Sequence, residues 1–338
     1  MYDESTPSRV TLEASDQALV DGILKRHPRA LAKAITLVES TRPDHRRRAA
    51  GLLDAILPHT GRSIRLGISG SPGAGKSTFI EALGLNLIGR GHRVAVLAID
   101  PSSSISGGSI LGDKTRMEHL SVNPDAYIRP SPSRGSLGGV ADKTREAMLI
   151  CEAAGFDVIL VETVGVGQSE TTVAGMVDAF VLIQLPNAGD DLQAIKKGIV
   201  EVADVIVVNK ADIDPDAAEL ARAQLAGALS LLRHASPNWN PVVVALSAAR
   251  NQGIDEFWGE IERLREAFSS SGELEAKRRR QSVDWMWSLI DSGLRSRFRE
   301  NPRVRRDLDS VSRSVSEGAM TAAAAAYRLL DYVEAADG

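Results

Sequence analysis

The chain has 338 residues, a hydrophobic content of 43% and a formal net charge of -4 at pH 7, which indicates a globular protein of one large or two ordinary domains. Interspersed charges argue against nucleic acid or a membrane surface as the main partner, and no apolar run approaches the roughly 20 residues of a transmembrane helix. The single cysteine, Cys151, excludes an internal disulfide, and the N-terminus lacks a secretion signal, so we expect a cytoplasmic protein.

Residues 15–57 carry apolar side chains at helical spacing. Leu19 and Ile23 are one turn apart, as are Leu31 and Ile35, and Leu52 is followed by Ile56. This pattern predicts an N-terminal helical arm over residues 1–60.

Short apolar strands alternate with amphipathic helices from residue 63 to about residue 270. The predicted strands read SIRLGIS, VAVLAI, AYIR, FDVILVE, DAFVLIQ, DVIVVN and PVVVALS. The clearest helices between them cover 77–90 and 140–154. Because the strands are continuous runs of Val, Ile and Leu, they indicate a sheet covered on both faces. We therefore predict an α/β domain over 61–270 with a doubly wound, mostly parallel sheet.

The strands stop after residue 270, and three helices are predicted over 276–300, 304–318 and 320–336, within a C-terminal segment 271–338. The basic cluster Lys277–Arg280 fits a solvated or salt-bridging helix face better than a nucleic-acid site, because no aromatic platform accompanies it. Two interpretations stay open for the aromatic residues of this segment: ordinary core, or an oligomer interface. These residues are Trp285, Trp287 and Tyr327.

The segment GSPGAGKST, residues 70–78, fits the P-loop pattern G-x-x-x-x-G-K-[ST]. It follows a predicted strand and opens a predicted helix, where backbone N–H groups and the helix N-terminus bind phosphate. Lys76 is expected to reach the β- and γ-phosphates, and Ser77 to ligate Mg²⁺. The predicted nucleotide-binding residues of this loop are Gly73, Ala74, Gly75, Lys76, Ser77 and Thr78.

The segment NKAD, residues 209–212, ends another predicted strand and indicates that the base is guanine. An aspartate here, Asp212, accepts hydrogen bonds from guanine N1 and N2, and adenine offers no matching donors. Asn209 and Lys210 complete the predicted base site, and the segment ALSA adds Ser247 and Ala248 as the loop that closes over guanine O6. The alternative is a helix N-cap at Asp212 or Asp214.

Glu162 is a carboxylate at the end of an apolar strand, immediately before a glycine-rich turn. In a doubly wound sheet the carboxyl ends of the strands meet the ligand, so Lys76, Asp100 and Glu162 should converge on the phosphates. We predict that Glu162 serves the Mg²⁺ shell or orients the hydrolytic water, with Gly165 near the γ-phosphate. The alternative is a cap for a helix at 169–176.

Four longer segments resemble the methylmalonyl-CoA mutase-associated GTPases, the MeaB/ArgK/MMAA-type P-loop GTPases. They read DPSSSISGGSILGDKTRM (100–117), PSPSRGSLGG (130–139), ETVGVGQSE (162–170) and LPNAGDDLQAIKKG (185–198). The resemblance extends over nearly the whole chain. It implies a GTPase that binds GTP, GDP and Mg²⁺, assembles with an adenosylcobalamin-dependent acyl-CoA mutase, gates cofactor loading, and protects or reactivates the mutase. It also implies a homodimer formed through the C-terminal helices.

The resemblance assigns further roles by motif. Asp100 and Asp113 would serve Mg²⁺ and the first switch, and residues 162–168 the second. The loop 185–198 would be a third switch that signals to the mutase, with Lys196 as the messenger. Glu162, Lys76 and Asp113 are the expected catalytic residues.

Phosphoryl transfer depends mainly on positioning and charge neutralisation, and no arginine is an obvious catalytic finger in cis. The candidates are Arg116, Arg134 and Arg145, each of which also fits a surface ion pair. We therefore expect slow intrinsic hydrolysis that accelerates when the mutase docks.

Three other functions are compatible with a nucleotide-binding loop. A GTPase for metal insertion is disfavoured, because the one cysteine and six histidines show no metal-ligand spacing. A kinase linked to arginine or ornithine transport would require a phosphoacceptor, and a scaffold would bind GTP without turnover. The sequence does not distinguish among methylmalonyl-, isobutyryl- and ethylmalonyl-CoA mutases as the partner.

Overall fold

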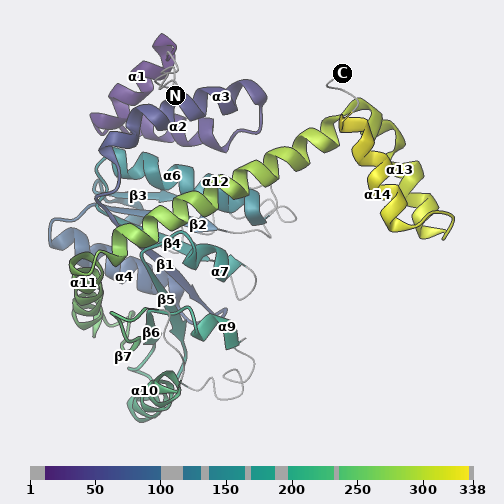
Figure 1. The fold of residues 1–338 in the computed structure, drawn as a ribbon. Helices are drawn as coiled ribbons and strands as arrows, with labels where there is room; N and C mark the ends of the chain where they lie inside the picture. The colour runs from purple at the N-terminus through teal and green to yellow at the C-terminus, as the bar shows by residue number, and fades with distance from the viewer. Residues whose placement is uncertain are drawn as a thin grey trace. The chain divides into compact units, whose positions relative to one another are not determined.

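The structure is a computed structural model that describes residues 12–99, 117–130, 137–163, 169–186, 197–231 and 236–334 (Figure 1). The chain divides into two compact units, Met1–Gln281 and Ser282–Gly338. The boundary between the two units falls inside the helix Glu273–Glu300. The division into parts at residues 60 and 270 stays a prediction.

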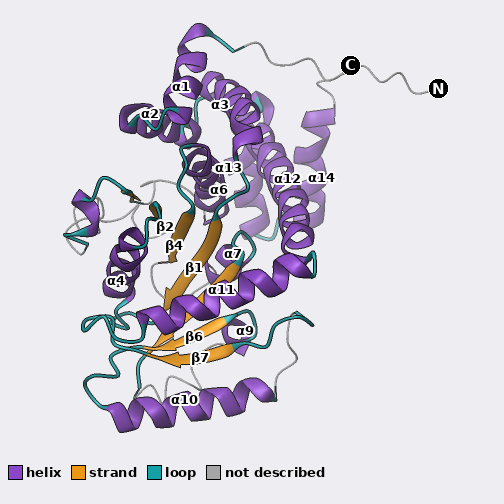
Figure 2. Ribbon diagram, turned by 90° about the vertical axis from the view of Figure 1, so that its left-hand side faces the viewer, coloured by secondary structure: helices purple, strands orange, loops and turns teal. Residues whose placement is uncertain are grey.

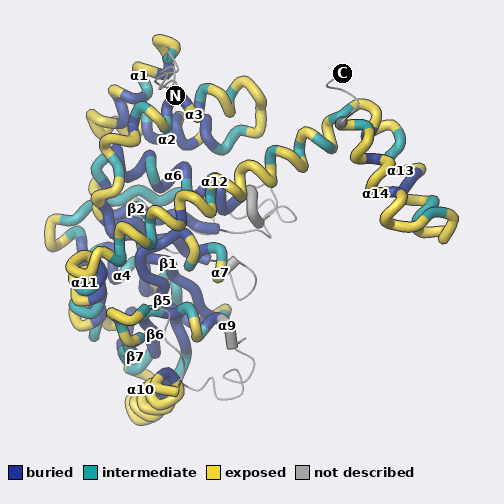
Figure 3. Tube along the Cα trace, viewed as in Figure 1, coloured by how far each residue is buried: buried dark blue, intermediate teal, exposed yellow. Residues whose placement is uncertain are grey.

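The described part of the first unit is built on a seven-stranded sheet of order β3-β2-β4-β1-β5-β6-β7, in which every pairing is parallel. The strands are β1 (Ile64–Gly70), β2 (Val94–Ile99), β3 (Ala126–Arg129), β4 (Val158–Thr163), β5 (Ala179–Gln184), β6 (Val205–Val208) and β7 (Val242–Ala245). Every residue of β2, β4, β5 and β6 is buried (Figure 3). The predicted parallel α/β sheet is therefore confirmed.

Helices cover both faces of this sheet (Figure 2). One face packs against α4 (Lys76–Gly89) and α11 (Ile254–Ser270), where the rings of Phe79 and Phe257 meet edge to face at 5.0 Å. The helices of the other face are α1 (Ala14–Leu24), α2 (Pro28–Glu39), α3 (Pro43–Ile56), α6 (Leu137–Ala153), α7 (Ser169–Ala174), α9 (Lys197–Val200) and α10 (Pro215–Ser230). Two 3-10 turns, η1 (Leu57–His59) and η2 (Leu120–Val122), complete the described elements of the unit.

The strand order places a topological switch point between β1 and β4. The connection from β1 through α4 leads to β2 on one side, whereas the connection from β4 through α7 leads to β5 on the other. In sheets of this kind the ligand binds in the crevice beyond the carboxyl ends of the two strands. The loops that follow Gly70 and Thr163 are therefore where the fold predicts a site.

The helix α12 (Glu273–Glu300) begins in the first unit, and its first turns are bonded to the amino end of the sheet. Arg278 donates to the Asp178 carboxylate at 2.7 Å, and this carboxylate also accepts the backbone N–H of Arg65 at 2.8 Å. Gln281 donates to the Val177 carbonyl at 2.9 Å. The contacts of Arg278 support the salt-bridging interpretation of the basic cluster.

The second unit contains the remainder of α12, α13 (Pro302–Ser316) and α14 (Ala322–Glu334), so helices are present where the sequence predicts them. Asn301 caps α13 by accepting the backbone N–H of Arg303 at 2.9 Å. Val311, Ala325 and Leu329 form a small core between α13 and α14. No helix in the described ranges is long and apolar enough to cross a membrane.

Candidate nucleotide site

The loop between β1 and α4 has positive φ angles at its glycines, and at two of them an added Cβ would also collide with a neighbouring element. At Gly70 (φ 155°) an added Cβ would lie 2.3 Å from the carbonyl oxygen of Ile183 on β5. Gly75 precedes α4 with φ 88°, and a Cβ there would lie 2.6 Å from Nδ2 of Asn209. The glycines thus let this loop lie against two neighbouring elements while the N-terminus of α4 points beyond the sheet.

Lys76 and Ser77 open α4 and make the polar contacts expected of a phosphate loop. The Lys76 ammonium donates to the carbonyl oxygens of Gly70 and Ser71 at 2.8 and 3.2 Å. The Ser77 hydroxyl donates to Oε1 of Glu162 at 3.1 Å. The Lys76 side chain therefore folds back onto carbonyl groups of its own loop, and the Ser77 hydroxyl points toward β4.

Glu162 lies at the centre of the carboxyl edge of the sheet. It is paired in register with Ile68 of β1 and Ala98 of β2, and it is only 7% exposed. Its neighbour Thr163 donates to the hydroxyl of Ser69 at 2.9 Å. The contact with Ser77 turns the Glu162 carboxylate toward the phosphate loop, which favours a role there over a cap for the helix that begins at Ser169.

Asn209 joins the three loops that surround the predicted base site. Its amide donates to the carbonyl of Ala74 in the P-loop at 2.8 Å and accepts the backbone N–H of Ala248 at 3.1 Å. The backbone N–H of Ala211 donates to the Leu246 carbonyl at 3.1 Å. All three loops are therefore fixed to one another by bonds that use no nucleotide atom.

Asp212 and Asp214 have separate roles in the structure. Asp214 is the N-cap of α10 and accepts the backbone N–H of Ala217 at 3.0 Å. The Asp212 side chain is 23% exposed and lies 3.7 Å from Nε of Arg250. A hydrogen bond from the Ser247 hydroxyl holds the pKa of the Asp212 carboxyl below its usual value. The capping alternative thus applies to Asp214, and Asp212 stays available as an ionised acceptor.

The loop after β7 is closed by a short bridge between Ser247 and Gln252, which exchange two backbone hydrogen bonds of 3.0 Å. Inside it, Arg250 donates its backbone N–H to the Ser247 hydroxyl at 3.2 Å, and Asn251 has φ 54°. Sequence reasoning did not single out Arg250, because no motif marks it: the residue reaches Asp212 only through the turn of this loop.

The remaining predicted residues divide by position. Gly73 (φ 80°) and Thr78 are exposed parts of the phosphate loop, and Lys210, with φ 63°, lies in the left-handed region beside Asn209. Arg145 donates to the backbone carbonyls of Gly175 and Gln281, each at 2.9 Å. Six predicted residues lie outside the described ranges: Asp100, Asp113, Arg116, Arg134, Gly165 and Lys196.

The oxygen donors at the switch point suit a hard cation. Mg²⁺ prefers carboxylate and hydroxyl oxygens and keeps several waters, and Ser77 and Glu162 supply such oxygens side by side. Within the described ranges no group of three or more His, Cys, Asp or Glu side chains could hold a metal ion. One hydroxyl and one carboxylate suit an ion that takes its other oxygens from substrate and water, as Mg²⁺ does in nucleotide sites.

A glycine-rich loop between a buried strand and a helix, a carboxylate on the adjacent strand and an N-K-x-D loop two strands away are the features of a P-loop GTPase. Residues 31–303 match the family model described as "Methylmalonyl Co-A mutase-associated GTPase MeaB", and the chain belongs to this family. It is a GTPase that binds guanine nucleotide.

Known proteins are similar to this chain over most of its length. The chain is 54% identical over 257 residues to "GTPase ArgK" of Escherichia coli, a match that covers 76% of this chain and 78% of the relative. It is 47% identical over 334 residues to "Methylmalonic aciduria type A homolog, mitochondrial" of Mus musculus, covering 94% and 80%. A solved structure described as an LAO/AO transport system kinase is similar with a TM-score of 0.75 and 38% identity, covering 96% of this chain and 99% of that one.

Proposed function

We propose that this GTPase is a chaperone that gates adenosylcobalamin loading of an acyl-CoA mutase and protects or reactivates that enzyme in the cytoplasm. Methylmalonyl-CoA mutase is the partner we propose first. The observation that carries the proposal is the match of residues 31–303 to a family described as associated with that mutase. The name of the mouse relative, which refers to methylmalonic aciduria, is consistent with it.

In the proposed complex the phosphates lie in the loop 70–78 and guanine lies at Asp212. Backbone N–H groups of Gly73, Ala74 and Gly75 and the N-terminus of α4 would bind the phosphates. Asp212 would accept the two donors of the guanine edge, and Ala248, held by Asn209, would approach guanine O6. Asn209, Lys210 and Ser247 would form the rest of the base site.

Ser77 and Glu162 would hold Mg²⁺ or its waters. Asp100 and Asp113 are proposed as further residues of its shell or of the first switch. When bound, the ion neutralises charge on the phosphate oxygens. The Ser77 hydroxyl would turn from the Glu162 carboxylate toward the ion, and Glu162 would then face the ion's waters or the hydrolytic water, with Gly165 near the γ-phosphate.

Hydrolysis in this site would depend on positioning. Lys76 must exchange the carbonyls of Gly70 and Ser71 for phosphate oxygens, which are stronger acceptors because they are charged. Arg145 already binds the backbone carbonyls of Gly175, which follows α7, and of Gln281 in α12, which argues against its use as a catalytic finger. We therefore expect slow hydrolysis by the protein alone and faster hydrolysis with the mutase bound.

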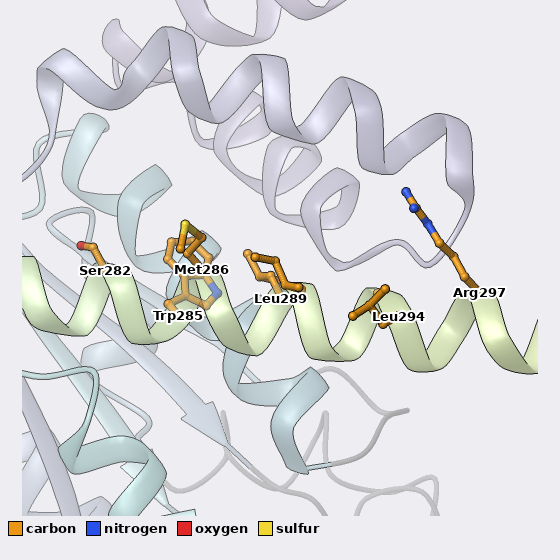
Figure 4. A pocket seen from close by; sticks show the side chains of 8 residues that line it. Ser282, Trp285, Met286, Leu289, Leu294 and Arg297 are labelled. Atoms are coloured by element: carbon orange, nitrogen blue, oxygen red, sulfur yellow. The ribbon is translucent and has the colours of Figure 1, made fainter. Parts of the chain in front are cut away.

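We also propose that the protein is a homodimer formed through α12. This helix exposes a row of apolar side chains, of which Trp287 is 57% exposed and Leu294 is 59% exposed. Trp285, Met286 and Leu289 line a shallow pocket along the same helix (Figure 4). A second copy is the occupant implied by the family resemblance, and large exposed apolar patches mark such interfaces.

Analytical ultracentrifugation tests the dimer. Leu294→Glu, which puts a charge in the apolar row, should convert the protein to monomers. Arg295→Glu is the matched control, because this exposed residue does not line the pocket. Equal sedimentation of the Leu294→Glu variant and the wild type would remove α12 from the dimer proposal.

The chaperone proposal is tested by a cobalamin-transfer assay on purified methylmalonyl-CoA mutase with GTP and with a non-hydrolysable analogue. Wild type should co-purify with the mutase, and transfer should depend on which nucleotide is present. Lys76→Ala should lose nucleotide binding, whereas Glu162→Gln should bind GTP but hydrolyse it slowly. Lys196→Ala should hydrolyse GTP normally yet lose the nucleotide dependence of transfer. If the mutase neither co-purifies with the protein nor alters its hydrolysis rate, the proposed partner is wrong.

A transport-linked kinase is the second candidate, and the observation that favours it is the similarity to a structure described as a transport system kinase. With GTP labelled in its γ-phosphate, a kinase would transfer label to an acceptor molecule. The GTPase chaperone should release it only as inorganic phosphate. Detection of a labelled protein product would favour the kinase.

A further inference from the structure

Arg250 is the basic side chain at the predicted guanine subsite to which none of the motifs assigns a role. Its Nε lies 3.7 Å from Oδ2 of Asp212. The Arg250 side chain is 71% exposed, so it can leave this position without unpacking other residues, and the Asp212 side chain is only 23% exposed. In this pair the acceptor, Asp212, is the less exposed residue, and the donor, Arg250, is exposed enough to move away.

The loop 247–252 fixes where this donor begins. The paired backbone bonds between Ser247 and Gln252 close the loop, and the N–H of Arg250 is bound by the Ser247 hydroxyl. The same hydroxyl is the main cause of the lowered pKa of the Asp212 carboxyl, so it lies beside that residue as well. Ser247 therefore contacts the backbone of Arg250 and neighbours the carboxylate of Asp212, and the exposed arginine side chain is the part of the pair with most room to move.

Guanidinium and guanine present similar groups to a carboxylate. Arginine carries planar N–H donors in a fork, and the guanine edge carries N1–H and the N2 amino group side by side. A carboxylate binds such paired donors through its two oxygens. The Asp212 side chain is 23% exposed, and guanidinium and guanine would compete for its same two oxygens.

We propose that Arg250 is a positioning residue of the guanine subsite, whose guanidinium pairs with Asp212 while the subsite is empty and is displaced by the edge of the incoming guanine. This inference rests on the proposed placement of guanine at Asp212. Before guanine binds, the Arg250 guanidinium lies beside the Asp212 carboxylate that guanine would use. Guanine must compete with it, so the pair lowers the association rate and the affinity.

The size of the effect follows from the exposure of the pair. Exposed ion pairs stabilise a state by at most a factor of about 5, and salt weakens them. Arg250→Gln should therefore lower the Kd for GDP by about 1.5- to 5-fold, mainly through faster association. Arg250→Lys keeps the charge but not the fork, and its Kd should fall between those of wild type and Arg250→Gln.

The experiment is stopped-flow binding of a fluorescent GDP analogue, with calorimetry of GDP itself, at low salt and at about 1 M salt. Arg222→Gln is the matched control: it removes the same charge from an exposed pair with Glu219 on α10. At low salt, the Kd of wild type divided by the Kd of Arg250→Gln should be larger than the Kd of wild type divided by the Kd of Arg222→Gln. At high salt the ratio for Arg250→Gln should approach 1. Thermal unfolding without nucleotide checks that both variants are folded.

Tighter binding that is lost in salt supports the proposal. Unchanged or weaker GDP binding by Arg250→Gln overturns it, since the arginine would then have no effect on the subsite or would contact the nucleotide directly. A gain that persists unchanged at high salt also overturns it. If guanine does not bind at Asp212 at all, substitution of Asp212 itself should leave GDP binding unchanged. That result would identify failure of the proposed guanine site, as distinct from failure of the proposal for Arg250.

Discussion

Asn209→Ala tests whether the three loops of the site are held together before nucleotide binds. The change removes one side chain and leaves two backbone groups without partners, the Ala74 carbonyl and the Ala248 N–H. Asn209 is 2% exposed, Ala74 0% and Ala248 5%, so water replaces these bonds poorly. An unsatisfied buried group costs about 1–3 kcal/mol, and two of them with partial relaxation give a loss of about 2–4 kcal/mol in the free energy of unfolding.

Urea unfolding without nucleotide measures this loss. Asn86→Ala is the matched control, because the Asn86 amide makes one exposed bond to Asp255 on the other side of α4, and its loss should cost no more than about 1 kcal/mol. GDP affinity should fall for Asn209→Ala and stay constant for the control. If both variants unfold at the same urea concentration and bind GDP equally, Asn209 does not organise the site.

Three further substitutions test the fold around the site. Arg278→Ala leaves the buried Asp178 carboxylate, which is 2% exposed, without its charged partner, and urea unfolding should show a loss of about 3 kcal/mol. A loss below about 1 kcal/mol would contradict the importance of this pair. Gly70→Ala places a Cβ against the carbonyl of β5, and calorimetry should show GDP affinity at least about 10-fold lower; unchanged affinity would show that the loop adapts. Burial raises the pKa of Glu146 despite the nearby Lys143, so ionisation of this carboxyl opposes folding. The free energy of unfolding therefore falls as pH rises from the unfolded-state pKa to the higher folded-state pKa. Glu146→Gln should therefore melt at a higher temperature than wild type at pH 7 and at nearly the same temperature below pH 4, and a lower melting temperature at pH 7 would refute this sign.

The parts of the site that depend on local sequence could be predicted. Strands such as VAVLAI are apolar at every position because both faces of the sheet are covered, and the P-loop requires glycine where its backbone approaches β5. Glu162 could be placed at the sheet's carboxyl edge because it comes at the end of an apolar strand, immediately before a glycine-rich turn. In each case the residues that carry the signal are neighbours in the sequence.

Contacts between distant segments could not be predicted. The bond from Asn209 to Ala74 spans 135 positions, and the pair of Arg278 with Asp178 spans 100. The position of β4 between β1 and β2 follows from the strand order and not from any single segment. The proximity of Glu162 to the phosphate loop could nevertheless be predicted, because ligands bind beyond the carboxyl ends of the strands in such sheets, and the bond from Ser77 to Glu162 agrees with that prediction. The proposed role of Arg250 depends on the turn after β7, which no motif marks.

The most direct test of the site is the base specificity of an Asp212→Asn variant. Asparagine can donate to the carbonyl that xanthine carries in place of the guanine amino group, and it no longer offers two acceptors to guanine. Calorimetry should show that the wild type binds GDP in preference to ADP and XDP, and that Asp212→Asn reverses the preference between GDP and XDP. An Asp212→Asn variant that retains the wild-type preference for GDP would contradict the placement of guanine at Asp212.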